Sequence, residues 1–122
     1  MDCSREIIGA CIEVHRILGP GLLESAYEMC LCYELSQRKL SFQRQVPLPV
    51  DFKGMRMDCG YKMDVVVENS ILLELKSIEE LGPIHDAQLL TYLKLSRLKI
   101  GLLINFNVPL MKDGIKRMVN NL

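Results

Sequence analysis

The sequence predicts an α/β sandwich, in which helices pack on a mixed β-sheet. Apolar residues recur at helical spacing over the first 39 residues and then alternate at a period of two from residue 46. A later helical segment is followed by an apolar run at residues 100–106, which indicates a crossover that returns the chain to the sheet. The expected order is α-α-β-β-β-α-β, with room for one closing strand.

The first two elements are predicted to be helices. Asp2 or Ser4 can cap the first helix, whose apolar positions recur at helical spacing at Ile7, Ile8, Cys11, Ile12, His15 and Leu18. Residues 19–21, Gly-Pro-Gly, end this helix and turn the chain. A second helix is expected from about residue 22 to residue 39, with a buried stripe of Leu23, Tyr27, Cys30, Leu31 and Leu35.

Three strands are expected next. In the first, residues 46–52, Pro47 and Pro49 lack the N–H needed for ladder hydrogen bonds, which predicts an edge strand. Residues 53 and 54 turn into a second strand over residues 55–67, with Gly60 as a bulge or bend. Its apolar face comprises Met55, Met57, Cys59, Tyr61, Met63, Val65 and Val67, and its polar face comprises Arg56, Asp58, Lys62 and Asp64. The third strand spans residues 71–76.

The last third of the chain is predicted to contain a helix and one or two strands. Gly82 and Pro83 open a helix that extends to about Ser96 and has apolar positions at Leu89, Leu90, Leu93 and Leu95. The apolar run at residues 100–106 suits a strand that is covered on both faces. Alternation over residues 115–119 favours a final strand over a helix.

Length and composition indicate one soluble domain that spans residues 1–122. Hydrophobic residues make up 49% and charged residues 25% of the chain, and no apolar run approaches the roughly 20 residues that cross a bilayer. The first residues lack the pattern of a secretion signal, so we expect a cytoplasmic protein without membrane association. Fifteen basic and fifteen acidic residues disfavour tight binding of nucleic acid by charge alone, although a local basic rim remains compatible with this balance.

The five cysteines do not form a zinc-binding pattern, because the sequence contains no CxxC pair. An odd number of cysteines without a secretion signal predicts reduced and mostly buried thiols.

The residues with the greatest chemical interest lie in the predicted second and third strands. Side chains alternate across a strand, so Glu74 and Lys76 share one face. A three-residue loop at residues 68–70 pairs Val67 with Ile71 and places Asp64 opposite Glu74 on that face. A two-residue loop would instead place the two carboxylates on opposite faces of the sheet.

Two facing carboxylates repel each other unless a proton or a cation lies between them. Oxygen ligands favour a hard divalent cation, so Mg²⁺ or Mn²⁺ is the expected cofactor. The alternative is that Glu74 and Lys76 form a solvated ion pair on an exposed sheet face.

Several motifs resemble those of a known family. Asp64 with Glu74-Leu75-Lys76 has the form D-x9-ExK, which is similar to the metal-binding signature of PD-(D/E)XK nucleases. Residues 88–92, QLLTY, resemble the QxxxY motif of the RecB-like and lambda-exonuclease-like branches, and residues 21–27, GLLESAY, match the signature of the GxxExxY family. The order and spacing of these motifs resemble that family along the whole chain. One departure is Lys62, where the family pattern implies an arginine.

The resemblance implies a metal-dependent nuclease. Asp64 and Glu74 would bind the metal together with the carbonyl of Leu75, and Glu24 would reach it directly or through water. Lys76 would orient the attacking water, help to deprotonate it and offset charge on the phosphate. The sequence places Gln88 and Tyr92 one helical turn apart, and the resemblance implies that they contact the metal-bound water or the nucleic-acid strand.

Each residue also has a purely structural interpretation. Glu24 lies in the first turn of a helix, where the helix dipole favours an exposed carboxylate. Tyr27 and Tyr92 could be core aromatic residues, and His85 suits a surface or capping position. For the whole protein, the alternative is a nuclease-fold module that binds nucleic acid or a protein partner without cutting. We expect DNA to be bound in preference to RNA, and the sequence is compatible with a homodimer or a larger protein partner.

Overall fold

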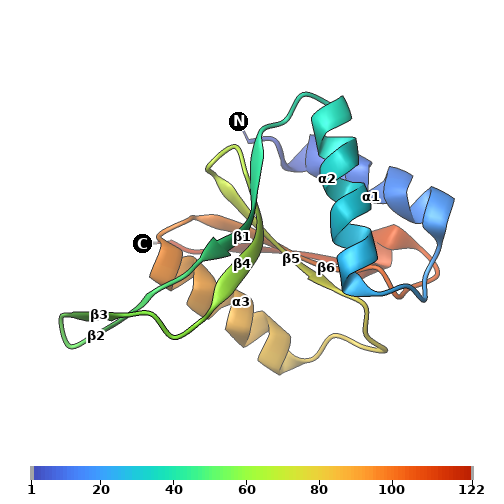
Figure 1. Ribbon diagram of the computed structural model, residues 1–122. Helices are drawn as coiled ribbons and strands as arrows, with labels where there is room; N and C mark the ends of the chain where they lie inside the picture. Colours follow the sequence, from blue (N-terminus) through green and yellow to red (C-terminus); the bar gives the residue numbers. More distant parts are fainter. Residues whose placement is uncertain (1, 122) are drawn as a thin grey trace.

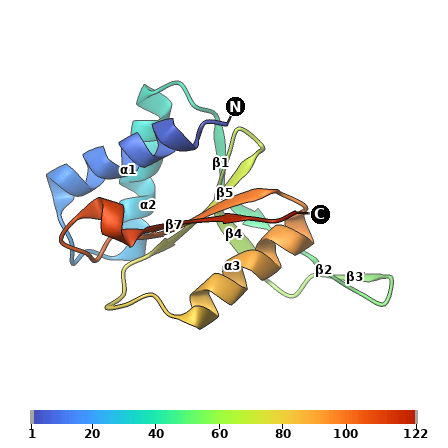
Figure 2. The same ribbon diagram turned by 180° about the vertical axis from the view of Figure 1, so that it is seen from behind.

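The computed structural model describes residues 2–121, so the two ends of the predicted domain, Met1 and Leu122, lie outside it. A five-stranded sheet with the order β1-β4-β5-β6-β7 forms the centre of the fold. Helices α1 and α2 cover one face of this sheet and α3 covers the other, as Figures 1 and 2 show from opposite sides. The predicted α/β sandwich with a mixed sheet is therefore confirmed.

The helices follow the predicted periodicity closely. They span Ser4–Leu18 (α1), Glu24–Gln37 (α2) and Pro83–Ser96 (α3). The predicted stripe of α2 is wrong at two positions, because Leu23 precedes the helix and is 77% exposed, and Cys30 is also exposed. The buried face of α2 consists of Tyr27, Glu28, Leu31, Cys32 and Leu35.

Two of the three strands predicted before α3 are divided. The strands are Phe42–Pro47 (β1), Val50–Phe52 (β2), Met55–Met57 (β3), Lys62–Val67 (β4) and Ile71–Lys76 (β5). The first predicted strand breaks at residues 48–49, and the second breaks between Met57 and Lys62, where Gly60 has a φ of 81°. Strands β2 and β3 form a separate hairpin, and β1 is an edge strand as predicted.

Strand β5 lies at the centre of the sheet. It pairs antiparallel with β4 and parallel with β6 (Ile100–Asn105), which it reaches through the crossover helix α3. A 3₁₀ turn (η1, Met111–Gly114) then leads into β7 (Ile115–Val119), which pairs antiparallel with β6. The predicted final strand is therefore confirmed.

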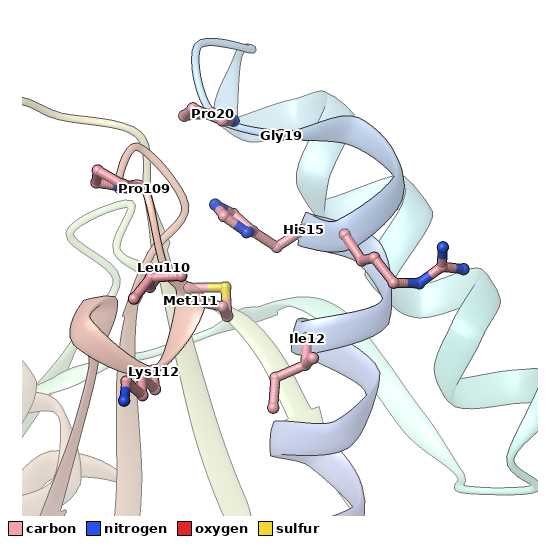
Figure 3. Close-up of a pocket in the computed structure, with 9 residues that line it drawn as sticks. Ile12, His15, Gly19, Pro20, Pro109, Leu110, Met111 and Lys112 are labelled. Atoms are coloured by element: carbon pink, nitrogen blue, oxygen red, sulfur yellow. The ribbon is translucent and has the colours of Figure 1, made fainter.

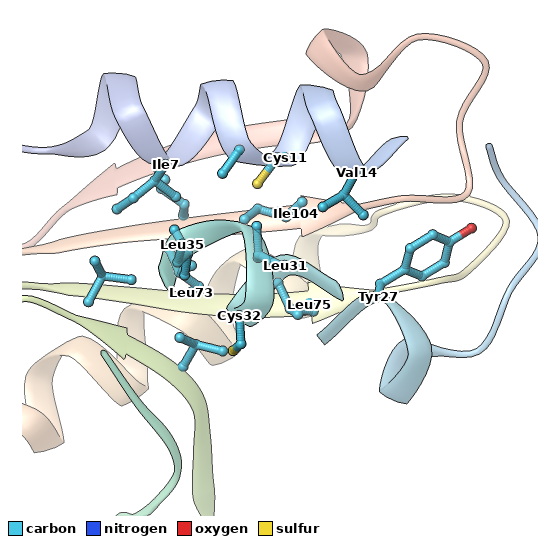
Figure 4. Close-up of a cluster of buried hydrophobic side chains, with 14 of the residues drawn as sticks. Ile7, Cys11, Val14, Tyr27, Leu31, Cys32, Leu35, Leu73, Leu75 and Ile104 are labelled. Carbon is cyan, nitrogen blue, oxygen red and sulfur yellow. The ribbon is translucent and has the colours of Figure 1, made fainter. Parts of the chain in front are cut away.

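Two apolar clusters stabilise the sandwich. The larger cluster packs α1 and α2 against one face of the sheet, and Figure 4 shows Ile7 of α1 and Leu31 and Leu35 of α2 together with Leu73 and Ile104 of the sheet. The smaller cluster packs α3 against the opposite face. The sheet interior is thus apolar on both faces, and charged side chains there require specific partners.

Met63 lies on a different face from the one predicted. The alternation placed it with Val65 and Val67, but Met63 and its partner Val46 pack in the α3 cluster, whereas Val65 and Val67 pack under α1 and α2. The alternation is broken between Met63 and Val65, where the pairing of β1 with β4 is interrupted. A strand irregularity of this kind changes the face of the sheet on which the next side chains lie. The alternation of apolar residues in the sequence does not reveal this change.

The prediction of mostly buried cysteines is also wrong. All five thiols are free, but only Cys11 and Cys32 are buried, whereas Cys30 and Cys59 are exposed. Burial raises the pKa of the Cys11 thiol to about 12, which makes this side chain an inert part of the core.

Candidate active site

Strands β4 and β5 separate at the position of the two predicted metal ligands. Val67 pairs with Ile71, as the three-residue loop requires, but the ladder ends at Val65 and Leu73. Beyond that point the backbone N–H of Asp64 donates to Glu74 Oε2 at 2.9 Å, and the N–H of Leu75 donates to Asp64 Oδ2 at 2.8 Å. The two carboxylates therefore take the place of backbone acceptors where the strands separate.

An irregularity in β1 accompanies this separation. β1 pairs with β4 at Arg44 and at Val46, but Gln45 does not pair with Asp64, and its φ is 50°. A left-handed conformation at a residue other than glycine is uncommon and often marks a functional position. It leaves the N–H of Asp64 without a partner on β1 and available to Glu74.

Both carboxylates have unusual protonation behaviour. Glu74 is 6% exposed, and burial followed by repulsion from Asp64 raises its pKa to about 8. Burial also raises the pKa of Asp64, and the charges of Glu28 and Glu24 act in the same direction. Without a cation, burial and the neighbouring Asp64 charge therefore favour the protonated form of Glu74.

Lys76 is half-buried beside these carboxylates, and its positive charge lowers the pKa of both of them. Within residues 2–121, no carboxylate lies close enough to form an ion pair with its ammonium group. This contradicts the alternative in which Glu74 and Lys76 form a solvated ion pair. The ammonium is instead available to a ligand.

The hydrogen bond of the Leu75 N–H indicates which way the carbonyl of the same residue faces. The N–H and the C=O of one residue point to the same side of a strand. Because the N–H of Leu75 reaches Asp64 on the β4 side, its carbonyl faces the same gap between the strands.

Glu24 reaches the site from the first turn of α2. Its Oε2 accepts a 3.4 Å hydrogen bond from the N–H of Ser77, the residue after Lys76, and its charge raises the pKa of both Asp64 and Glu74. The Glu24 side chain is otherwise exposed and lines a shallow depression of about 360 Å³ with Leu22, Leu23, Ser25 and Ser77.

Tyr27 fixes the turn that carries Glu24. Its ring is fully buried and stacks on Phe106 with 4.4 Å between ring centroids. Its hydroxyl donates to the carbonyl of Gly19 and accepts from the N–H of Leu22. Tyr27 is thus a structural residue that holds residues 19–22 against α2.

Glu28 is a buried acidic residue that the sequence analysis missed. It is 7% exposed, its Oε2 accepts from Arg44 at 3.0 Å, and its Oε1 accepts from Gln45 at 2.8 Å. These contacts tie α2 to the irregular part of β1, and the Glu28 charge raises the pKa of Asp64. Its position four residues after Glu24, on the same helix face, is the signal that could have revealed it.

Gln88 and Tyr92 lie together on α3, on the same side of the sheet as Glu74. The Gln88 amide donates to the Tyr92 hydroxyl at 3.4 Å, and Gln88 is half-buried. Tyr92 is 8% exposed, and burial raises its pKa, with Glu74 and Asp64 adding to the rise. His85 accepts from the N–H of Gly82 through Nδ1 at 2.8 Å, which confirms its predicted capping position.

The oxygen atoms at the site suit a hard divalent cation. Asp64 and Glu74 each accept a hydrogen bond from a backbone N–H with one carboxylate oxygen. The other oxygens, Asp64 Oδ1 and Glu74 Oε1, are free for a further partner. Within residues 2–121, Asn120 Nδ2 is the only buried side-chain N or O atom that lacks a hydrogen-bond partner. Asp64 Oδ1 and Glu74 Oε1 also lack a partner and are not among such buried atoms, so both oxygens are accessible to solvent. Within the same residues, no three His, Cys, Asp or Glu side chains converge on one point. An ion held by the two carboxylates would therefore complete its shell with a carbonyl and water, as Mg²⁺ commonly does.

A second depression, of about 470 Å³, lies between α1 and residues 109–112 (Figure 3). None of the predicted site residues lines it. His15 points into this space and its Nε2 lies 2.7 Å from the carbonyl of Val108. This contact joins α1 to the loop before η1.

A mixed sheet with helices on both faces, whose central strands present Asp64, Glu74 and Lys76 together, defines a nuclease-like α/β domain. A family model described as the PD-(D/E)XK nuclease superfamily matches residues 1–118, and the chain belongs to this superfamily. The narrower resemblance to the GxxExxY family remains a prediction. Searches of curated proteins and of solved structures found no match. No helix within residues 2–121 is long and apolar enough to cross a membrane.

Proposed function

We propose that this protein is a metal-dependent nuclease that hydrolyses phosphodiester bonds in nucleic acid, with DNA favoured over RNA. The observation that carries the proposal is the pair of carboxylates at the separated strands, each with one free oxygen, beside Lys76, which has no acidic partner within residues 2–121. Membership of a nuclease superfamily supports the same chemistry.

Asp64 Oδ1, Glu74 Oε1 and the Leu75 carbonyl would hold Mg²⁺ or Mn²⁺, with Glu24 as a further ligand through water. When bound, such an ion stabilises negative charge on a phosphate and lowers the pKa of water. It would also replace the proton on Glu74, because a positive charge favours the ionised carboxylate.

Lys76 would orient the attacking water and offset the charge that develops on the phosphate. Gln88 would contact the water or the strand through its amide, and its hydrogen bond to Tyr92 would orient that amide. The Tyr92 hydroxyl could also donate to a phosphate oxygen, since its raised pKa keeps it protonated.

A second candidate is a nuclease-fold module that binds nucleic acid or a protein partner, including a second copy of the chain, without cutting. Two observations favour it. Asp64 and Glu74 already accept backbone hydrogen bonds, and the formal net charge is zero. This module would retain the fold and lack turnover.

One assay separates the two candidates. The purified protein is incubated with Mn²⁺ and end-labelled single-stranded, duplex and flapped DNA and RNA, beside Asp64→Ala and Lys76→Ala. The nuclease predicts cleavage by the parent protein that both substitutions abolish. Binding without cleavage on every substrate would support the second candidate.

A further inference from the structure

The segment from Asp51 to Lys62 is exposed at every residue. It contains most of the β2–β3 hairpin, which forms a two-stranded sheet of its own. Figures 1 and 2 show that the hairpin projects away from the body of the protein. We refer to residues 51–62 as the arm.

The hairpin has one apolar and one charged face. Val50 pairs with Met57 and Phe52 pairs with Met55, so these four side chains share a face, whereas Asp51 and Arg56 pair on the other face. Phe52 and Met55 are 59% and 62% exposed. An isolated hairpin is marginally stable in water, and exposed apolar residues grouped in this way indicate a binding surface.

Two of the three charges on the arm that form no ion pair within residues 2–121 are positive. Lys53 lies 5.6 Å from the centre of the Phe52 ring, and neither Lys53 nor Lys62 forms an ion pair with any residue in the described part of the chain. Asp51 lies 3.9 Å from Arg56, whereas Asp58 accepts from the backbone N–H of Gly60 and is the third of these charges. Exposed rings next to unpaired lysines complement a polyanion whose groups can stack.

The base of the arm adjoins the candidate active site. The half-exposed ring of Tyr61 meets the ring of Tyr92 edge-on, with 6.1 Å between centroids. Tyr92 accepts the hydrogen bond from Gln88, and β4 carries Asp64 two residues after Lys62. A strand bound along the arm would therefore continue towards Asp64 and Glu74.

We infer that the arm binds an unpaired nucleic-acid strand, with bases stacked on Phe52 and Tyr61 and phosphates near Lys53 and Lys62. The assignment of this strand as substrate rests on the proposed function. An unpaired strand fits better than a duplex, because the faces of paired bases are covered by their neighbours and cannot stack on a protein ring.

Binding is measured by fluorescence anisotropy with a labelled oligothymidylate and with a duplex of equal length, in chelator so that nothing is cut. Phe52→Ala and Tyr61→Ala should each weaken single-strand binding at least about fivefold, since stacking contributes about 1–3 kcal/mol per base. Lys53→Gln should reduce the slope of log affinity against log salt by about 0.7. Tyr33→Ala removes a ring of similar exposure from α2 and should have no effect.

An abasic residue in the oligonucleotide provides a second readout. It should weaken binding by the parent protein and have a smaller effect on Tyr61→Ala, while Tyr61→Phe behaves like the parent. Equal binding by the parent, Phe52→Ala and Tyr61→Ala would overturn the inference, as would tighter binding of the duplex. Light scattering tests whether the arm instead binds a second copy of the chain. A parent protein that is a dimer and becomes a monomer in Phe52→Ala would overturn the inference and identify the second copy as the partner of the arm.

These outcomes are separable from those of the proposed function. Binding through the arm without cleavage in Mn²⁺ would support strand binding by the arm and exclude the proposed nuclease activity. Cleavage that is insensitive to Phe52→Ala and Tyr61→Ala would support the nuclease activity and overturn strand binding by the arm.

Discussion

The backbone N–H of Asp64 donates a 2.9 Å hydrogen bond to the side chain of Glu74. The reciprocal feature is the hydrogen bond from the N–H of Leu75 to the Asp64 side chain. Together they fix both carboxylates at the separated strands and leave one oxygen of each free. These free oxygens could bind a cation.

Divalent cations should stabilise the fold. An ion that binds the folded state and not the unfolded chain raises the melting temperature by mass action. Mn²⁺ or Mg²⁺ at millimolar concentration should therefore raise the melting temperature of the parent protein and leave Asp64→Ala and Glu74→Ala unchanged. Differential scanning fluorimetry with Ca²⁺-free buffers measures this shift, and Asp58→Ala, which changes an exposed acid on the arm, is the matched control. A parent protein that does not respond to Mn²⁺ would contradict the metal site.

Stability without metal should fall as pH rises. The pKa of Glu74 is raised from 4.5 to about 8 in the folded state, so between these values the folded state binds more protons than the unfolded chain. The Glu74 contribution is fully present below pH 4.5 and is lost as pH rises through 8. The slope is at most about 1.4 kcal/mol per pH unit for one proton.

Glu74→Gln should flatten this pH dependence, because the amide keeps the acceptor for the N–H of Asp64 and cannot ionise. Urea unfolding at pH 6, 7, 8 and 9 in chelator measures the difference. If the parent and Glu74→Gln show parallel pH profiles, the raised pKa of Glu74 is excluded.

Gln88→Ala should impair cleavage or strand binding with little loss of stability, since its half-buried amide contributes little to the core. Tyr92→Phe should have a similar effect, because it removes the hydroxyl that accepts from Gln88 and keeps the buried ring. Tyr92→Ala should in addition destabilise the fold by about 3 kcal/mol or more, as large-to-small changes in a core do. Chemical denaturation beside a cleavage assay distinguishes the two effects. A large loss of stability in Gln88→Ala would show that the motif is structural.

The contact between Glu28 and Arg44 should be asymmetric. Arg44→Ala leaves a buried carboxylate without its cation, whereas Glu28→Gln leaves an arginine whose side chain is 46% exposed and can be solvated. We therefore expect Arg44→Ala to destabilise the fold by about 2 kcal/mol or more and Glu28→Gln to destabilise it less. Urea denaturation measures both values. The reverse order would contradict the role of Glu28 as a buried anchor for β1.

Most of the fold could be predicted because its periodic segments are long. Helices α1 and α3 and strand β5 follow the expected intervals closely, and the odd-length loop at residues 68–70 fixes the register of β4 and β5. The breaks at residues 48–49 and 58–61 were harder to predict. At both breaks the alternation of apolar and polar residues continues through the interruption. A prediction from this alternation alone therefore gives one long strand where the structure has two.

The site was predicted in part for the same reason. Alternation identified the shared face of Glu74 and Lys76, but it could not predict the missing pair at Gln45, since a left-handed conformation at one residue has no period-two signature. Glu28 was missed because a buried stripe was defined by apolar residues, and a charge enters such a stripe only with partners on another element, here Arg44 and Gln45.

Lys76→Ala and Asp64→Ala should have different effects on metal binding. An ammonium group has only donors and cannot bind a cation, so the role of Lys76 lies with the water and the phosphate charge, which matter in the transition state. Calorimetric titration with Mn²⁺ and single-turnover cleavage are performed on the parent and both variants. We predict that Lys76→Ala binds Mn²⁺ at least as well as the parent and cuts about 100-fold or more slowly, whereas Asp64→Ala loses both properties. Cleavage by Lys76→Ala at the parent rate would exclude a catalytic role for Lys76.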